Sequence, residues 1–278
     1  MRNNQNRLAA PPVADAQTAP AAAAANLSFV VPTEFVELPS KGKFYPADHP
    51  LHNQKTIEIR YMTAKEEDIL ASTALIKNGL VIERLLSNII VLDMDPTTLL
   101  VGDRSAIMIA ARISSYGYDY KASVYCEACQ KHQEYGFDLR KANLRQTCFD
   151  QKFLSDNNIK INEEKGIFEV KLPKSNVLLG IKLITGKKER TTDEVEESNQ
   201  NLVTDTLSRF VVSVNGDETP STVAEFVCNM LAADSRYLRI ILSDLTPNID
   251  LNQEFTCKEC GNSQDKEVPL TAEFFWPE

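Results

Sequence analysis

The chain carries two Cys-x-x-Cys motifs, Cys126-Glu-Ala-Cys129 and Cys257-Lys-Glu-Cys260. A short polar turn follows each motif, and an alternating apolar segment follows each turn. This pattern is typical of a zinc knuckle, a tight turn that presents two thiolates to one metal ion. Two knuckles together supply four thiolates, which complete a tetrahedral site and leave no position for water or substrate. The sequence therefore predicts one structural zinc ion bound by Cys126, Cys129, Cys257 and Cys260.

The second motif begins 131 residues after the first (257 minus 126). A zinc ribbon usually separates its two pairs by about 15 to 20 residues, so this site would join the two halves of the chain. The same shift places Asp103 on Asp234 and Ile107 on Leu238. Both aspartates are predicted to be N-caps of helices. We infer two copies of a helix-strand-knuckle-strand unit.

The expected fold is mixed α+β. It consists of two pseudo-repeats, each a small helical bundle plus short antiparallel strands, joined by a split zinc-ribbon-like element with four cysteine ligands. Residues 1–27 contain ten alanines and three prolines and are predicted to be a disordered tail, because they bury too little apolar surface to offset ordering entropy. Residues 28–147 form the first repeat, with a strand, the bundle and a knuckle. Residues 148–278 form the second repeat, with a hairpin, helices and the other knuckle.

Local patterns place elements around the motifs. Residues 56–62 alternate apolar and polar side chains, which predicts a half-buried strand. Thr63 and Glu66 then match a capping box, in which each side chain accepts a hydrogen bond from a free amide at a helix start. Residues 166–184 predict a β-hairpin that turns at residues 173–176.

Charge and composition limit the partners. The net charge is −9 and the pI about 5.0, whereas binding to phosphate backbones needs clustered Lys and Arg. No apolar run approaches the roughly 20 residues of a membrane span, and no signal core follows the N-terminus. We therefore expect neither nucleic acid nor membrane as a partner, and thiols that stay reduced. Cys228 lies in an apolar helical segment and is predicted to be a buried thiol.

Motifs for catalysis are lacking. The three histidines, His49, His52 and His132, have no neighbours of catalytic type, and residues 40–43 lack the Walker spacing of a phosphate loop. The Cys-x-x-Cys motifs could also be thioredoxin-like redox pairs, or cysteines without metal. Neither motif opens a helix after a strand, however, which is the arrangement that lowers a redox thiol's pKa. The sequence favours a scaffold or interaction protein and predicts that the chain is not an enzyme.

Three segments carry a family resemblance. They are Phe35-Val-Glu-Leu-Pro-Ser-Lys-Gly-Lys-Phe-Tyr-Pro, Ile57-Glu-Ile-Arg-Tyr-Met-Thr-Ala-Lys-Glu-Glu-Asp-Ile-Leu and Asp234-Ser-Arg-Tyr-Leu-Arg. Over roughly residues 33 to 275 the chain resembles the baseplate hub assembly proteins of T-even-type contractile-tailed bacteriophages. The resemblance implies a virion-assembly role through protein contacts, as a hub subunit or as an assembly chaperone. The implied partners are phage baseplate hub and tail proteins, met in the host cytoplasm during assembly or in the virion tail baseplate.

Within the first of these segments, Lys41, Gly42, Phe44 and Tyr45 are the candidate partner-binding residues, or residues that define the local architecture. Two other functions stay open at this point. One is a zinc-ribbon protein that binds nucleic acid, and the other is a thiol oxidoreductase.

Overall fold

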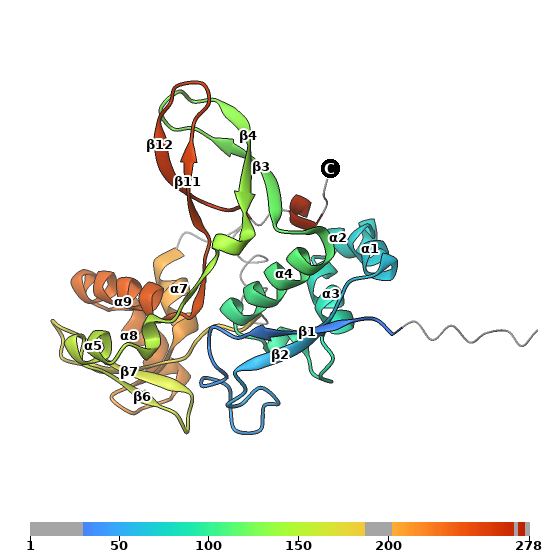
Figure 1. The fold of residues 1–278 in the computed structure, drawn as a ribbon. Helices are drawn as coiled ribbons and strands as arrows, with labels where there is room; N and C mark the ends of the chain where they lie inside the picture. Colours follow the sequence, from blue (N-terminus) through green and yellow to red (C-terminus); the bar gives the residue numbers. More distant parts are fainter. Residues whose placement is uncertain (1–29, 187–201, 270–271, 276–278) are drawn as a thin grey trace, which may run out of the picture. The chain divides into compact units, whose positions relative to one another are not determined.

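The structure is a computed structural model that describes residues 30–186, 202–269 and 272–275. The predicted tail, residues 1–27, lies outside the described residues. The described residues from Pro32 onward belong to one compact unit. Its architecture is mixed α+β with small antiparallel sheets (Figure 1), as the sequence predicts.

The first part of the unit is an antiparallel strand pair followed by helices. The pair is β1 (Thr33–Glu37) with β2 (Thr56–Arg60), and β2 confirms the predicted strand. The capping box is also confirmed, because the Thr63 amide donates to Glu66 Oε2 at 2.8 Å at the start of the first helix. The helices are α1 (Ala64–Leu70), α2 (Thr73–Lys77), α3 (Val81–Ile89), the 3-10 turn η1 (Pro96–Thr98) and α4 (Val101–Tyr116).

A hairpin and a four-stranded sheet follow. The hairpin is β3 (Asp119–Tyr125) with β4 (His132–Asp138). Short elements lead from it to the sheet: η2 (Leu139–Lys141), β5 (Asn143–Arg145), η3 (Thr147–Phe149) and α5 (Gln151–Asp156). The sheet has the order β6 (Ile159–Asn162), β7 (Ile167–Lys171), β8 (Leu178–Ile181), β9 (Val211–Val214), antiparallel throughout. The β7–β8 pair confirms the predicted hairpin.

The last part is again helices followed by a hairpin. The elements are α7 (Leu202–Phe210), α8 (Pro220–Cys228), α9 (Ala232–Leu245), β10 (Asn248–Asp250), which pairs with β5, the hairpin β11 (Asn252–Thr256) with β12 (Ser263–Glu267), and η4 (Ala272–Phe275). In α8 the buried residues are Val223 and Val227, whereas Cys228 is exposed. The prediction of a buried thiol is wrong, because one residue turns the helix by about 100° away from the core-facing side.

The two aspartates predicted as N-caps occupy another position. Asp103 is the third residue of α4, which begins at Val101, and the prediction is therefore wrong. The Asp103 side chain is fully buried and accepts hydrogen bonds from Ser40 N at 2.9 Å, Ser40 Oγ at 2.5 Å and the Tyr45 hydroxyl at 2.8 Å. This carboxylate fixes the loop after β1 against the first turn of α4.

Asp234 has the corresponding place in the second part. It is the third residue of α9, is fully buried, and accepts from the backbone amides of Lys174 and Ser175, both at 2.9 Å. The amides belong to the β7–β8 turn. Both anchored segments begin with Leu-Pro directly after a strand, at residues 38–39 and 172–173. Each aspartate therefore ties a strand pair to a helix some 60 residues later.

A continuous hydrophobic core links the two parts. Phe44, from the loop after β1, packs against Phe168 of β7 with ring centroids 4.7 Å apart, and against Phe149 at 5.7 Å. Phe44 and Phe168 are 2% and 0% exposed. The two hairpins that carry the cysteines therefore extend from parts of the chain that share one hydrophobic core.

Candidate metal centre

The four cysteines lie at the tips of two hairpins, β3–β4 and β11–β12, which project together from the body (Figure 1). The last pair of the β3–β4 ladder is Tyr125 with His132, so residues 126–131 form the first tip. The last pair of the β11–β12 ladder is Thr256 with Ser263, which makes residues 257–262 the second tip. Each Cys-x-x-Cys motif therefore occupies a tight turn, as the sequence predicts.

The two turns have the same backbone geometry. In the first, the Cys126 carbonyl accepts from Gln130 N and the Cys126 amide donates to the Lys131 carbonyl, both at 2.9 Å. Gln130 takes a left-handed conformation with φ of 58°, and Gly261 takes its place in the second turn with φ of 70°. The second turn makes the matching bonds, Gly261 N to the Cys257 carbonyl and Cys257 N to the Asn262 carbonyl, also at 2.9 Å.

The four sulfur atoms all lie within 4.8 Å of one another. The Sγ atoms of Cys126 and Cys260 are 3.7 Å apart, and those of Cys129 and Cys257 are 3.6 Å apart. A tetrahedral ion with metal–sulfur bonds of about 2.3 Å requires sulfur–sulfur distances of about 3.8 Å. The residues therefore fit a tetrahedral metal ion, and close sulfur contacts join the two hairpins.

Burial and backbone dipoles act on the sulfurs. Cys126 and Cys257 are buried, Cys129 is half-buried and Cys260 is exposed. The backbone amide of Cys260 is the largest cause that lowers the pKa of Cys257, to about 6. Burial raises the pKa of Cys129 to about 12. An N–H group that points at the Cys257 sulfur stabilises a thiolate there, the form that ligates metals.

Ion pairs join the hairpins at their tips. Lys131 Nζ lies 2.8 Å from Glu259 Oε2, and Lys266 Nζ lies 2.6 Å from Glu127 Oε1. The hydrogen bond from Lys266 lowers the pKa of Glu127. Both carboxylates are exposed to solvent, which screens the charges and makes these ion pairs weak. They orient the hairpins but do not by themselves hold them together.

Further down, the hairpins share packing and backbone contacts. The rings of Tyr135 and Phe255 meet edge to face with centroids 5.0 Å apart, and the Tyr135 hydroxyl donates to the Glu254 carbonyl at 3.0 Å. Gln253 exchanges two hydrogen bonds with the Asp138 backbone, at 2.9 and 3.2 Å. Sequence reasoning missed Gln253 and Tyr135, whose partners lie more than 100 residues away.

The candidate partner residues lie in the loop after β1. Phe44 and Tyr45 are each 2% exposed, so their side chains pack inside this chain. The Tyr45 hydroxyl donates to Asp103 and accepts from Leu100 N at 3.0 Å. Lys41 is half-buried, with Nζ 4.9 Å from the Phe149 ring centroid.

Gly42 is buried and has φ of 70°. A Cβ on it would lie 2.4 Å from both Gln54 N and Leu51 O. The burial and these close approaches favour the architectural role for Gly42, Phe44 and Tyr45.

The histidines have structural neighbours. His49 Nε2 lies 2.9 Å from Thr98 Oγ1, and His52 Nδ1 lies 2.8 Å from the Tyr45 carbonyl. His132 packs against Tyr125 with ring centroids 5.1 Å apart. In the portion of the chain described here, the four cysteines are the one cluster of three or more His, Cys, Asp or Glu side chains that could hold a metal ion.

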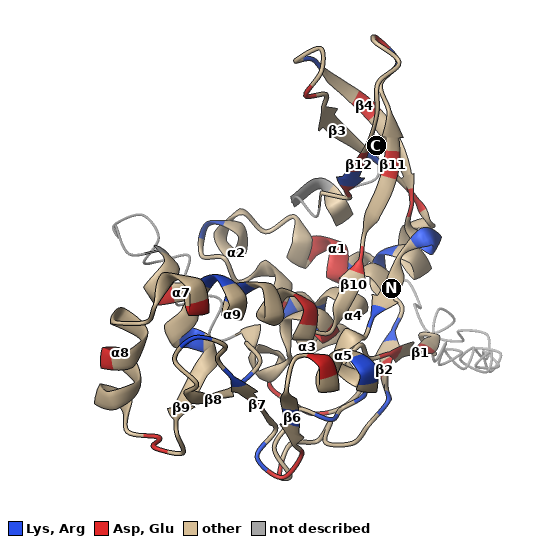
Figure 2. Cartoon of the chain, turned by 90° about the vertical axis from the view of Figure 1, so that its left-hand side faces the viewer, with Lys and Arg blue, Asp and Glu red and all other residues tan. Residues whose placement is uncertain are grey.

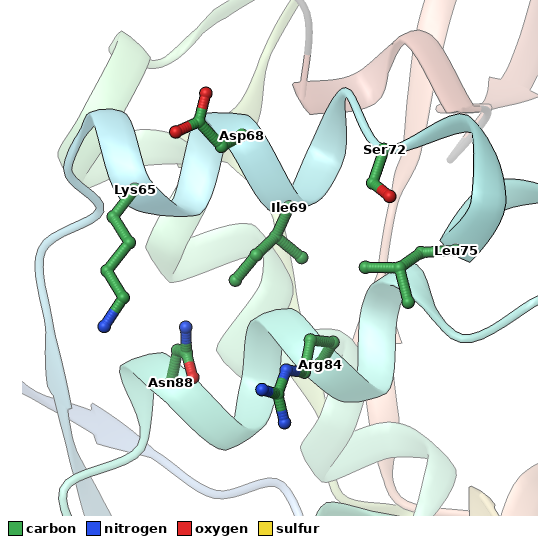
Figure 3. A pocket seen from close by; sticks show the side chains of 7 residues that line it. All are labelled: Lys65, Asp68, Ile69, Ser72, Leu75, Arg84 and Asn88. Carbon is green, nitrogen blue, oxygen red and sulfur yellow. The ribbon is translucent and has the colours of Figure 1, made fainter.

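An open pocket lies between α1 and α3 (Figure 3). Lys65 from α1 and Asn88 from α3 point toward one another across it. The lining residues are Lys65, Asp68, Ile69, Ser72, Leu75, Arg84 and Asn88. A neighbouring pocket shares Leu75 and Arg84. The lining contains no Cys or His, and its arrangement does not indicate a reaction.

These features define a class of protein: a mixed α+β chain with four clustered thiols, which could hold a metal ion, at the tips of two packed hairpins. A family model described as "T4 bacteriophage base plate protein" matches residues 31–276, which is most of the chain. The chain therefore belongs to this family of phage baseplate proteins. Among curated proteins and solved structures, none matches it significantly. None of the helices in the described ranges is long and apolar enough to span a membrane.

Proposed function

We propose that this protein takes part in assembly of the phage baseplate hub and acts through protein–protein contacts, as a structural subunit or as an assembly chaperone. The observation that carries the proposal is the family match over residues 31–276. A closed thiolate site supports the same role, because four protein ligands leave a metal no position for substrate. The partners are hub and tail proteins of the baseplate. The protein meets them in the host cytoplasm, and remains in the virion tail if it is a subunit.

The cofactor of this proposal is one structural zinc ion held by Cys126, Cys129, Cys257 and Cys260. Sulfur–sulfur distances of 3.6 and 3.7 Å support it, because they match the edge of a zinc–thiolate tetrahedron. The ion would join the tips of two hairpins that already touch through side chains. Its chemistry there is to cross-link the chain.

The chain is further proposed to be a tandem pseudo-repeat, with residues 28–147 and 148–278 as its copies. Support comes from the identical hydrogen bonds of the two knuckle turns and from the aspartates in the third position of α4 and α9. Both aspartates receive amides from a Leu-Pro segment that follows a strand. The matched turn hydrogen bonds, aspartate positions and Leu-Pro segments support a repeat more specifically than matched apolar positions do.

Within the candidate partner segment, Lys41 is the residue proposed to face a partner, because its side chain keeps partial exposure. Gly42, Phe44 and Tyr45 would then not contact the partner themselves. They would fix the conformation of the loop that presents Lys41. Burial of both aromatic rings supports this division of roles.

Two rival functions have less support. A nucleic-acid-binding zinc ribbon requires clustered cations, whereas the net charge is −9 and Figure 2 shows Lys and Arg interleaved with Asp and Glu. A gel shift at moderate salt that retained DNA or RNA would favour this rival. A thiol oxidoreductase requires a disulfide that cycles within one motif, and turnover in an insulin-reduction assay would favour it. The motifs instead occupy hairpin turns, and the sulfurs of each motif lie close to those of the other motif.

Metal analysis tests the cofactor. We expect one zinc per chain in the wild type and in Cys228→Ser, whose exposed thiol lies outside the cluster, and loss of zinc in Cys129→Ser. Equal zinc content in all three proteins would disprove the site.

Complementation tests the assembly role. A phage whose copy of this gene carries a stop codon should produce no complete baseplates, and supply of the wild-type chain in trans should restore them. Complete baseplates without the chain would overturn the proposal. Mass spectrometry of purified virions then separates a retained subunit from a chaperone.

A further inference from the structure

β1 is an edge strand with an unoccupied side among the described residues. β1 pairs only with β2 in the sheet that contains it. Leu38 N donates to the Lys55 carbonyl, and Tyr61 N donates to the Pro32 carbonyl. Hydrogen-bonded pairs alternate along an antiparallel ladder, so the even-numbered residues of β1 face β2. The backbone groups of Thr33, Phe35 and Glu37 therefore point away from the sheet.

The side chain in the middle of this edge is Phe35, which is 70% exposed. Its neighbour Val36 is buried on the opposite face of the strand. A large exposed aromatic residue next to free amide and carbonyl groups is the combination that favours pairing with another strand.

The second part of the chain shows which kind of strand fits this edge. β7, like β1, runs into a Leu-Pro segment whose amides bind the third-position aspartate of a later helix. β7 pairs with β8 on one side, as β1 pairs with β2. On its other side β7 pairs with β6, antiparallel. The corresponding side of β1 is the one that is open, so the missing neighbour is an antiparallel strand.

We propose that a second copy of this chain supplies that strand, so that β1 pairs with β1 of the partner copy around a two-fold axis at Phe35. A two-fold axis perpendicular to the sheet makes identical strands antiparallel, the same sense as β6 against β7. Phe35 then lies opposite Phe35 of the other copy, and Thr33 lies opposite Glu37. All three are residues whose backbone groups point outward, so each pair exchanges both of its hydrogen bonds.

The charges on this face are compatible with self-pairing. Glu37 of each copy lies opposite an uncharged Thr33, and that Thr33 is itself paired with Arg60 of β2. Across the joined sheet, Arg60 of one copy, Thr33 of that copy and Glu37 of the other copy therefore lie side by side. This order places a positive and a negative side chain in the same row. The two Phe35 rings form a cross-strand aromatic pair at the centre. No like charges are directly opposite, which would destabilise the pairing.

Solution mass tests the proposal on the full chain. At tens of micromolar, sedimentation equilibrium should give twice the chain mass of 31.1 kDa, falling toward the monomer on dilution. Phe35→Lys should remain a monomer, since a charged edge residue opposes strand pairing. Ile240→Lys is the matched control, because Ile240 is 54% exposed on α9, away from the edge, and it should dimerise like the wild type.

Hydrogen exchange gives a second readout. The outward amides of residues 33, 35 and 37 should become protected as concentration rises, whereas those of residues 34 and 36 should be protected at every concentration. Glu37→Pro removes an outward amide without removing a β1–β2 hydrogen bond, and it should also weaken the dimer. A wild type that is monomeric at all concentrations, or a dimer that Phe35→Lys leaves intact, overturns the proposal.

Discussion

The Sγ atoms of Cys126 and Cys260 lie 3.7 Å apart although 134 positions separate the two residues in the chain. The contact crosses between hairpins, and Cys129 meets Cys257 in the same way at 3.6 Å. An ion bound by this cluster would join the first half of the chain to the second, whereas a metal bound within one motif would not link the two hairpin tips.

The first prediction concerns the cross-link. A link that closes a loop of this length restricts the unfolded chain by about 4 to 5 kcal/mol. We expect Cys260→Ser to lower the free energy of unfolding by several kcal/mol, up to about this amount, as measured by thermal and urea unfolding. Cys228→Ser should stay within about 0.5 kcal/mol of the wild type.

A strong chelator extends the same experiment. It should lower the Tm of the wild type to that of Cys260→Ser and leave the variant unchanged, because the variant has no complete site to lose. A chelator effect of equal size in both proteins would mean that the stabilising metal is bound elsewhere.

The second prediction compares the two buried aspartates. Asp234 accepts from two backbone amides, which can only donate, so the side-chain NH₂ group that Asp234→Asn introduces would face a donor; we expect a loss of about 1 to 3 kcal/mol. Asp103 accepts partly from the hydroxyls of Ser40 and Tyr45, which can reverse their bonds. Asp103→Asn should therefore cost less in urea unfolding, and the opposite order would contradict this account.

The third prediction is the pH dependence of that difference. Burial acts to raise the pKa of Asp234, but the hydrogen bonds from Lys174 and Ser175 outweigh it and the pKa falls below 3.8. A lowered pKa adds stability above the unfolded value, and this stability is lost as pH falls through the folded value. The stability gap between wild type and Asp234→Asn should thus narrow below pH 3.8.

Asp103 should show the opposite sign. Burial raises its pKa above 3.8, against the hydrogen bonds from Ser40 and Tyr45. Its contribution is fully present below pH 3.8 and is lost as pH rises through the folded pKa. Relative to Asp103→Asn, the wild type should lose stability on going from acid to neutral pH, and a parallel pH profile for the two proteins would contradict the shift.

The fourth prediction separates steric from conformational cost in the loop after β1. Gly42 and Gly79 both have positive φ, 70° and 64°. A Cβ at Gly42 would meet backbone 2.4 Å away, whereas a Cβ at Gly79 meets nothing within 4 Å. Gly79→Ala should cost about 1 to 2 kcal/mol, and Gly42→Ala distinctly more. Equal losses in chemical denaturation would mean that the loop moves away from residue 54 at little cost.

The fifth prediction uses two phenylalanines on either side of the first Leu-Pro segment. Phe44 is 2% exposed and Phe35 is 70% exposed. Phe44→Ala should lower the free energy of unfolding by about 3 to 5 kcal/mol, because it leaves a cavity against Phe168. Phe35→Ala should change it by less than about 0.5 kcal/mol in dilute solution. A large effect at Phe35 in dilute solution would show that Phe35 packs within its own chain.

Short-range signals in the sequence predicted the elements that depend on short-range contacts. The Thr63–Glu66 capping box, the strand at Thr56–Arg60 and the β7–β8 hairpin were all predictable, because their hydrogen bonds join neighbours in the chain. The cysteine turns were predictable for the same reason. The match between the two halves at a shift of 131 residues then predicted that both turns contribute to one site.

The errors came from partners distant in the chain. An Asp near a helix start reads as an N-cap, yet the amides bound by Asp103 and Asp234 come from segments about 60 residues earlier. Cys228 was assigned to the wrong side of α8, since an apolar run does not show which side meets the core. The open side of β1 was not predictable, because strand order is a property of the whole sheet.

The distance in sequence between the two cysteine motifs would also determine the stage of folding at which a metal ion bound here acts. Contacts between residues so far apart carry a large loop-closure cost, so they form after helices and hairpins, late in folding. An interaction absent from the transition state slows unfolding and leaves the folding rate nearly unchanged. The bound ion would then slow unfolding and so lengthen the lifetime of the folded protein.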